Sequence, residues 1–184
     1  MPITPSEAQE VMDSADCLHS QQEIDAAIAN MALAITEDLK GQNPLVFCVM
    51  NGGLIVAGQL LTKLSFPLQY EYIHATRYGA ETSGGKLKWL VEPTNKVAGR
   101  TVLVIDDILD EGHTLTEIVK HCLAQGAADV KVAVLINKMH DRKAPEAKAH
   151  YIGLEVQDRF LFGYGMDYKS YWRNAPGIYA VKGL

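Results

Sequence analysis

The sequence predicts an α/β fold, a mostly parallel sheet flanked by helices, in a single domain that spans residues 1–184. Two observations support this. Short apolar runs of strand length alternate with amphipathic segments of helix length, and no repeat or Pro/Gly-rich linker divides the chain. With 184 residues, 48% of them hydrophobic, the chain can bury a core and has room for a small appended lobe.

The first clear helix signal begins at Ser20. Ser20 and Glu23 form a capping box, which is a typical helix start. Gly41 ends the segment, and its apolar residues recur at helical spacing: Ile24, Ala27, Ile28, Met31, Ile35 and Leu39. We therefore expect one amphipathic helix that reaches Leu39.

Two strands and a second helix are expected next. Residues 45–50 form a short apolar run, as in a strand buried on both faces, and a turn at 51–53 leads to a helix over 54–64. Residues 69–76 alternate as a strand does. The polar stretch 77–96 is long for a connector, and such a segment is more often a functional lid or a short hairpin.

The second half of the chain repeats the alternation. A β-branched run that starts at Val102 ends in carboxylates, and the helix after it reaches Leu123 and ends at Gly126. Residues 130–136 are apolar enough for another buried strand. Short strands and turns are expected beyond it.

Charge and composition narrow the class of protein. The formal net charge is −5 and the pI about 5.6, so no overall field attracts nucleic acid. No apolar run approaches the ~18 residues of a membrane span, and Met1–Glu10 lacks the features of a signal peptide. Cys17, Cys48 and Cys122 form no CxxC pair, and the two in apolar segments are interpreted as buried free thiols. We expect a cytoplasmic protein with neither a nucleic-acid nor a membrane partner.

Three acids stand together where the apolar run 102–105 ends. Asp106 and Asp107 are adjacent, and Asp110 follows before the next helix. An aspartate there can simply cap a turn. Three are more than packing needs, and like charges repel unless a cation or hydroxyl groups compensate them. Because ligands of open α/β sheets bind at the carboxyl ends of strands, these acids predict a functional site.

The segment after the acids opens a helix. Glu111-Gly112-His113-Thr114 could be an ordinary turn with a threonine cap. Alternatively, its backbone N–H groups and the Thr114 hydroxyl bind a phosphate at the helix N-terminus. The neighbouring acids favour the phosphate site.

Other chemistries lack their motifs. The sequence has no GxxxxGK[ST] motif, no HExxH and no zinc-type cysteine spacing. Gly163-Tyr164-Gly165 lacks the third glycine of a dinucleotide-binding loop.

The segment 104–114 resembles the phosphoribosyl pyrophosphate (PRPP) signature of type I phosphoribosyltransferases. More narrowly, the chain resembles the hypoxanthine-guanine phosphoribosyltransferase family from about Pro44 to Lys182. The other matching pieces are Met50-Asn51-Gly52-Gly53, Arg77-Tyr78-Gly79, Val134-Leu135-Ile136-Asn137-Lys138 and the run from Phe160 to Tyr168. The resemblance implies the type I phosphoribosyltransferase fold, with a small hood lobe built from N- and C-terminal segments.

The resemblance implies a role for each acid. Asp106 and Asp107 engage the ribose hydroxyls and Mg²⁺, the implied cofactor, which holds the departing pyrophosphate. Asp110 faces the purine and accepts a ring proton, which makes it the catalytic residue. Asp167 reaches a second metal or the edge of the base.

The resemblance places the 5′-phosphate of PRPP in the turn formed by Glu111, Gly112, His113, Thr114 and Leu115. The familiar form of the signature has a hydroxyl residue where Glu111 stands. An acid aimed at a phosphate would repel it, so we expect the Glu111 side chain to point outward and only its N–H to contribute.

The pyrophosphate group is assigned to Asn51, Gly52 and Arg173. Several relatives have a cis peptide before the residue that matches Asn51. Others carry a basic residue there. Because Asn51 has no charge, Arg173 and Mg²⁺ would have to neutralise more of the pyrophosphate charge in this chain. An ordinary Asn-Gly turn is the alternative reading.

The purine is assigned to Lys138, Phe160, Leu161 and Asp167. Lys138 would donate to the 6-oxo group, which disfavours adenine because adenine presents a donor there. Phe160 would stack on the base, although core packing is an equally good interpretation of it. The lid over 77–96, with Arg77 and Tyr78, would close over the sugar and exclude water, and its Ser83-Gly84-Gly85 would be poorly ordered without ligand.

The expected function is Mg²⁺-dependent transfer of phosphoribosyl from PRPP to hypoxanthine or guanine, as a homodimer or homotetramer. One alternative is a xanthine-preferring relative, and another is a regulatory protein on the same fold without turnover. A phosphoacceptor signalling domain would need acids after the strand 45–50, where Asn51 stands instead.

Overall fold

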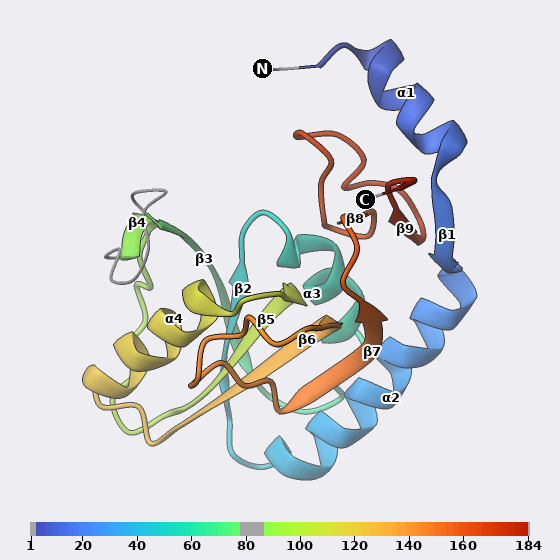
Figure 1. The fold of residues 1–184 in the computed structure, drawn as a ribbon. Coiled ribbons are helices and arrows are strands. Elements are labelled where there is room, and N and C mark those ends of the chain that lie inside the picture. The colour runs from blue at the N-terminus through green and yellow to red at the C-terminus, as the bar shows by residue number, and fades with distance from the viewer. Residues whose placement is uncertain (1–2, 78–86, 184) are drawn as a thin grey trace.

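The computed structural model describes residues 3–77 and 87–183. A six-stranded sheet in the order β4-β3-β2-β5-β6-β7 forms its centre, and all neighbours are parallel except β3 and β4. Its strands are β2 (Leu45–Val49), β3 (Gln69–Arg77), β4 (Leu87–Val91), β5 (Thr101–Leu109), β6 (Asp129–Met139) and β7 (Tyr151–Gln157). The fold is therefore the predicted α/β type (Figure 1).

Helices cover both faces of this sheet. The helices α2 (Gln21–Leu39) and α3 (Gly53–Leu61) pack on one face and α4 (His113–Ala124) on the other (Figure 1). Strand side chains alternate between the two cores: Val46 and Cys48 contact the α2–α3 side, whereas Leu45 and Phe47 contact the α4 side. Burial on both faces explains why these strands are continuous apolar runs in the sequence.

Local signals explain where α2 begins and how it is held. The Ser20 side chain accepts the Glu23 N–H and the Glu23 carboxylate accepts the Ser20 N–H, so the predicted capping box is confirmed. Near the other end of the helix, the Tyr151 hydroxyl of β7 donates to Asp38 at 2.8 Å. Thus α2 is tied to the sheet edge by a hydrogen bond as well as by its apolar stripe.

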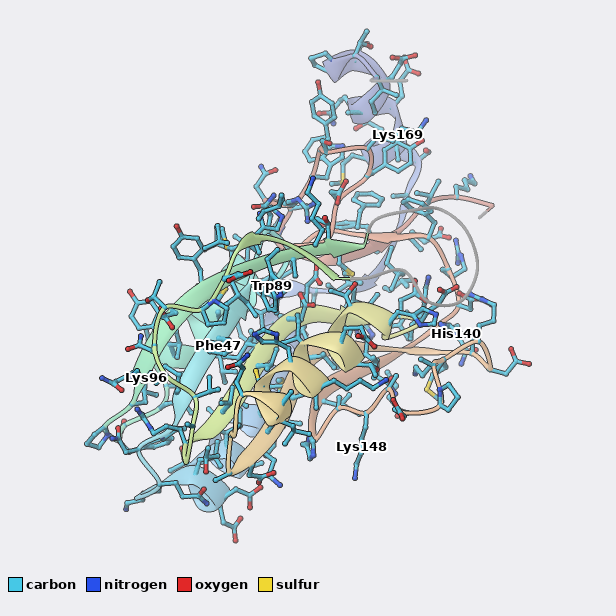
Figure 2. All side chains as sticks on the ribbon, turned by 90° about the vertical axis from the view of Figure 1, so that its left-hand side faces the viewer. Phe47, Trp89, Lys96, His140, Lys148 and Lys169 are labelled. Carbon is cyan, nitrogen blue, oxygen red and sulfur yellow. The ribbon has the colours of Figure 1, made fainter. Side chains whose placement is uncertain are left out.

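A second, three-stranded sheet joins the two ends of the chain. Its order is β1 (Asp16–His19), β9 (Ile178–Ala180), β8 (Leu161–Phe162), all antiparallel. The short helix α1 (Pro5–Ser14) lies beside it, where the Trp172 indole donates to the Ala8 carbonyl at 2.6 Å. Figure 2 shows Lys169 in this part of the molecule, next to α1.

The strand order places the ends of β2 and β5 next to each other. From β2 the chain continues outward to β3, whereas from β5 it continues to β6 on the opposite side. The sheet therefore reverses its winding between β2 and β5, and the crevice at their carboxyl ends is where such sheets bind ligands. Asn51 follows β2 there, and Asp106 lies near the end of β5.

Several element boundaries differ from the sequence-based expectation. The helix expected over 54–64 spans Gly53–Leu61, and the strand expected over 130–136 extends to Met139 because it pairs with β7 as far as Gln157. The helix α1 was not predicted. Within the stretch 77–96, residues 87–91 form β4 against β3, whereas Tyr78 and Ser83-Gly84-Gly85 lie outside the described residues.

Two further expectations can be compared with the structure. Cys48 and Cys122 are buried free thiols as predicted, and burial raises the pKa of each to about 11, whereas Cys17 is exposed. In the described part of the chain, no helix combines the length and hydrophobicity that crossing a bilayer requires.

Truncation of Ile28 tests the packing of α2. Ile28 has 0% exposure, so Ile28→Ala should lower the free energy of unfolding by roughly 2–5 kcal/mol through lost burial and a residual cavity. Leu33 on the same helix is 71% exposed, and Leu33→Ala should change stability by no more than about 0.5 kcal/mol. Urea unfolding followed by circular dichroism measures both, and equal losses would contradict the packing described here.

Candidate active site

Two carboxylates lie side by side near the carboxyl end of β5. Asp107 is 8% exposed, and the Asp107 N–H donates to the Asp106 Oδ1 at 2.9 Å. Burial raises the pKa of both groups, and the charge of Asp107 raises that of Asp106 further. Such a pair needs compensating positive charge or hydrogen-bond donors from a ligand.

Two glycines allow the chain to approach this pair closely. A Cβ on Gly52 would lie 2.1 Å from the Asp107 Oδ2, and a Cβ on Gly165 would lie 2.1 Å from the Gly52 carbonyl oxygen. At Gly165, where the clash is with backbone and φ is +108°, only glycine fits, whereas a side chain at Gly52 would displace the Asp107 carboxylate. The loop after β2, the end of β5 and the loop after β8 therefore meet at Asp107. The Met50–Asn51 peptide of the first loop is cis.

The turn between β5 and α4 surrounds a cavity of about 280 Å³. Gly112 precedes the helix with φ +78°, a left-handed conformation that glycine adopts without strain. The first helical hydrogen bond runs from the Thr116 N–H to the Gly112 carbonyl, so the N–H groups of residues 113–115 lie at the open end of the helix. The cavity is lined by Asp106, Asp107, Ile108, Asp110, Glu111, Gly112, His113, Thr114 and Leu115. This arrangement suits an anion.

The Glu111 side chain is half exposed. Its Oε2 lies 3.5 Å from the His113 Nε2, and its backbone carbonyl accepts the Ala144 N–H at 2.8 Å. The carboxylate is thus engaged with the neighbouring imidazole at the surface.

Asp110 belongs to a cluster of charged groups at the end of β6. The Lys138 ammonium lies 2.9 Å from the Asp110 Oδ2, and the His140 Nε2 lies 2.7 Å from the Asp110 Oδ1. Partial burial alone would raise the pKa of Asp110, but these hydrogen bonds outweigh it and the net effect is a lowered pKa. Asp110 is therefore ionised at neutral pH.

A second cavity, of about 250 Å³, adjoins Asp110. Phe160 borders it and is 45% exposed, with its ring packed edge-on against Tyr168 at 5.6 Å between centroids. The lining residues are Asp107, Ile108, Asp110, Lys138, Phe160, Leu161, Met166 and Asp167. An exposed aromatic face beside a buried ammonium suits a flat, polar ring.

Asp167 and Arg173 form an ion pair beside these cavities. The Arg173 Nη2 lies 2.5 Å from the Asp167 Oδ1, and its Nη1 donates to the Gly165 carbonyl. The other Asp167 oxygen accepts the Ser170 N–H at 2.7 Å. The Arg173 charge also acts to lower the pKa of Asp106 and of Asp107, so it reaches the acidic pair electrostatically.

The donor set fits a magnesium ion that arrives with a phosphorylated ligand. Within residues 3–77 and 87–183, no three acidic, histidine or cysteine side chains gather into a group able to hold a metal by themselves. Asp167 in particular is held by Arg173. Mg²⁺ commonly uses one or two carboxylates and completes its shell with water and substrate phosphates, and Asp106 and Asp107 match that requirement.

Most of the residues singled out from the sequence thus lie around two neighbouring cavities. Of the two lid residues, Tyr78 lies outside the described part, and Arg77 ends β3. Sequence reasoning missed His140. It lies just beyond β6, and no spacing in the sequence links it to Asp110, which stands 30 residues earlier.

Comparisons with known proteins give consistent results. The model of the phosphoribosyl transferase domain family matches residues 14–169. The hypoxanthine-guanine-xanthine phosphoribosyltransferase of Tritrichomonas foetus is 32% identical over 90% of this chain and 90% of that protein. The hypoxanthine-guanine phosphoribosyltransferase of Bacillus subtilis (strain 168) is also 32% identical, over 90% of this chain and 92% of that one.

Solved structures agree with these relatives. A hypoxanthine-guanine-xanthine phosphoribosyltransferase superposes with a TM-score of 0.84 at 30% identity, covering 93% of this chain and 99% of that one. A hypoxanthine phosphoribosyltransferase of Trypanosoma cruzi superposes with a TM-score of 0.85 at 27% identity, covering 93% and 97%.

Replacement of Asp106 by asparagine tests the strain between the two acids. Asn keeps an oxygen for the Asp107 N–H but removes a charge that is poorly solvated there, so Asp106→Asn should raise the free energy of unfolding at pH 7 by about 1 kcal/mol or more. Because the folded-state pKa of Asp106 is raised, the wild-type penalty is present above that pKa and disappears as the pH falls toward the unfolded value. The difference should therefore shrink between pH 7 and pH 4 in urea titrations. A variant less stable than wild type at pH 7 would contradict this.

Proposed function

The chain belongs to the hypoxanthine-guanine phosphoribosyltransferase family, and from this we propose that it transfers phosphoribosyl from PRPP to hypoxanthine or guanine. The products are IMP or GMP and pyrophosphate, and the activity serves purine salvage. One observation carries the proposal. The anion-type cavity and the aromatic cavity share Asp107, Ile108 and Asp110, so a sugar bound there would join a phosphate on one side to a flat base on the other.

The PRPP side uses the end of β5 and the start of α4. The 5′-phosphate binds to the N–H groups of the turn 111–115 and to the Thr114 hydroxyl. The ribose hydroxyls donate to Asp106 and Asp107, which relieves the repulsion between these acids. The pyrophosphate lies toward Asn51, Gly52 and Arg173.

Asp106 and Asp107 would hold Mg²⁺ together with oxygens of the substrate, and the bound ion would supply positive charge to neutralise the departing pyrophosphate. Asp167, which lines the base cavity and is paired with Arg173, is a further carboxylate that could reach a second metal or the edge of the base.

The base side uses β6 and the loop after β7. The Lys138 ammonium donates to the 6-oxo group, and Phe160 stacks on the ring while the Leu161 backbone meets its far edge. Adenine would place its amino group against the ammonium, donor against donor, and this mismatch excludes it.

Asp110 acts on the base. The ring nitrogen attacks the anomeric carbon as the bond to pyrophosphate breaks, and the ring N–H proton passes to the Asp110 carboxylate. The carboxylate is ionised and lies between the two cavities, which is the position a proton acceptor needs.

Two accessory parts complete the proposal. The sheet β1-β9-β8 and the loop after β8, built from both ends of the chain, form the hood over the base. The segment 77–96 is the lid, and β4 anchors one side of it against β3. Closure would exclude water from the activated carbon.

We also propose that the protein forms a homodimer or homotetramer and that it resides in the cytoplasm. Exposed apolar side chains support association: Leu54, Tyr70 and Tyr72 are 53%, 68% and 58% exposed and border an apolar cavity of about 460 Å³.

A xanthine-preferring enzyme is the second candidate. It is favoured by one relative whose name includes xanthine among its bases. The two candidates share the PRPP site and differ only in the base cavity.

Incubation of the purified protein with Mg²⁺, PRPP and one base at a time tests the proposal. Hypoxanthine and guanine should give nucleotide and pyrophosphate, xanthine should react more slowly, and adenine should not react. Fastest turnover with xanthine would select the second candidate. If none of the four bases gives nucleotide, the proposal is overturned, and the remaining alternative is a regulatory protein on this fold.

Asp110→Asn tests the assigned base. A positioned general base contributes ~10²–10⁴-fold, so kcat with hypoxanthine should fall by about 10² or more while KM for PRPP changes little. The matched control is Asp129→Asn, which removes a half-exposed carboxylate that also pairs with a lysine, Lys131, at the far end of β6. Full activity in Asp110→Asn would reject this residue as the base.

A further inference from the structure

His140 contacts the assigned base directly. Its Nε2 lies 2.7 Å from the Asp110 Oδ1, and its side chain is only 3% exposed. It follows β6 in the turn beyond Lys138, and Figure 2 shows it on the opposite side of the molecule from Lys96. None of the roles assigned above uses it.

The hydrogen bonds of the ring determine its tautomer. The Arg142 N–H donates to the His140 Nδ1 at 3.1 Å, so Nδ1 carries no proton. The proton of the neutral imidazole therefore resides on Nε2, which donates to Asp110.

The two donors to Asp110 differ in how many partners they serve. The Lys138 ammonium binds the Asp110 Oδ2 at 2.9 Å and also lies 3.4 Å from the Asp158 Oδ1. In the proposed reaction it must serve the purine oxygen as well. The His140 Nε2 has the single proton that it gives to Asp110.

The turn that carries His140 is held from several sides. The Lys143 ammonium donates to the Asn137 Oδ1 and to the Lys138 carbonyl, both at 2.6 Å. The Arg142 guanidinium donates to Asp158 at 2.7 Å. These contacts place the imidazole in advance of ligand binding, so little reorganisation is needed during the reaction.

We propose that His140 is a positioning residue that holds the Asp110 Oδ1 while Lys138 releases the Oδ2 to the purine. The inference rests on the proposed function. The N–H bond of the purine then breaks, the proton bonds to the Oδ2, and the bonding pair stays on the ring nitrogen that attacks the sugar. His140 keeps its Nε2 proton throughout.

Two substitutions separate this role from a structural one. The amide nitrogen of Gln reaches the place of the His Nε2, whereas the amide oxygen of Asn reaches that of Nδ1. His140→Gln thus keeps the donor to Asp110 and loses the acceptor for the Arg142 N–H, and His140→Asn does the reverse.

We expect His140→Asn to lower kcat about ten-fold, part of the contribution of a positioned base, with KM for PRPP within about two-fold of wild type. His140→Gln should stay within about two-fold of wild type in both constants. A purely structural role predicts the opposite order, because Asn preserves the turn.

The control is His150→Asn, since His150 also accepts a backbone N–H, that of Val132, but near the start of β6. It should leave kcat unchanged. Wild-type kcat in His140→Asn, or equal loss in both His140 variants, would overturn the inference. If His140→Asn does not fold, His140→Gln decides alone: retained kcat supports the role and a ten-fold loss rejects it. A wild-type protein without activity would instead reject the proposed function.

Discussion

The burial of two adjacent carboxylates at the end of β5 is the constraint on which the rest of the site depends. Asp106 and Asp107 are placed there by a strand that is apolar up to Ile105, and the glycines at 52 and 165 leave no room for side chains beside Asp107. Removing these acids from water costs free energy that the folded chain recovers only partly, through backbone hydrogen bonds and the charge of Arg173. The fold thus keeps a charged, poorly compensated pair ready for hydroxyl groups and a cation.

The sheet topology decides what else can reach this pair. Because winding reverses between β2 and β5, the loop after β2 and the turn after β5 open into one crevice. The neighbouring strand β6 brings Lys138 to the same edge. The residues before and after β8, late in the chain, add Phe160 and Asp167. The anion-type cavity and the aromatic cavity therefore meet at Asp107 and Asp110.

Patterns within a short stretch of sequence were sufficient to predict the strands of the large sheet, the helix α2 and the acidic turn. The capping box at Ser20 and the apolar run before Asp106 are local signals with one structural outcome. The helix α1 also has a capping box, formed by Thr4 and Glu7. Ala8 is its only buried residue, so the sequence contains no apolar stripe that would indicate a helix there. The contact of His140 with Asp110 joins residues 30 positions apart and depends on the parallel pairing of β5 and β6. Such a contact has no signature in sequence spacing alone.

The indole that donates to Ala8 has an optical consequence. The chain has two tryptophans, which report on different places. Trp172 reports on the attachment of α1. Trp89 reports on β4, and the centroid of its ring lies 4.9 Å from that of the His121 ring. Because indole emission depends on local polarity and hydrogen bonding, each gives the molecule a built-in fluorophore. Release of the amino-terminal helix and rearrangement at the base of β4 can thus be followed as separate spectroscopic events in the unlabelled protein.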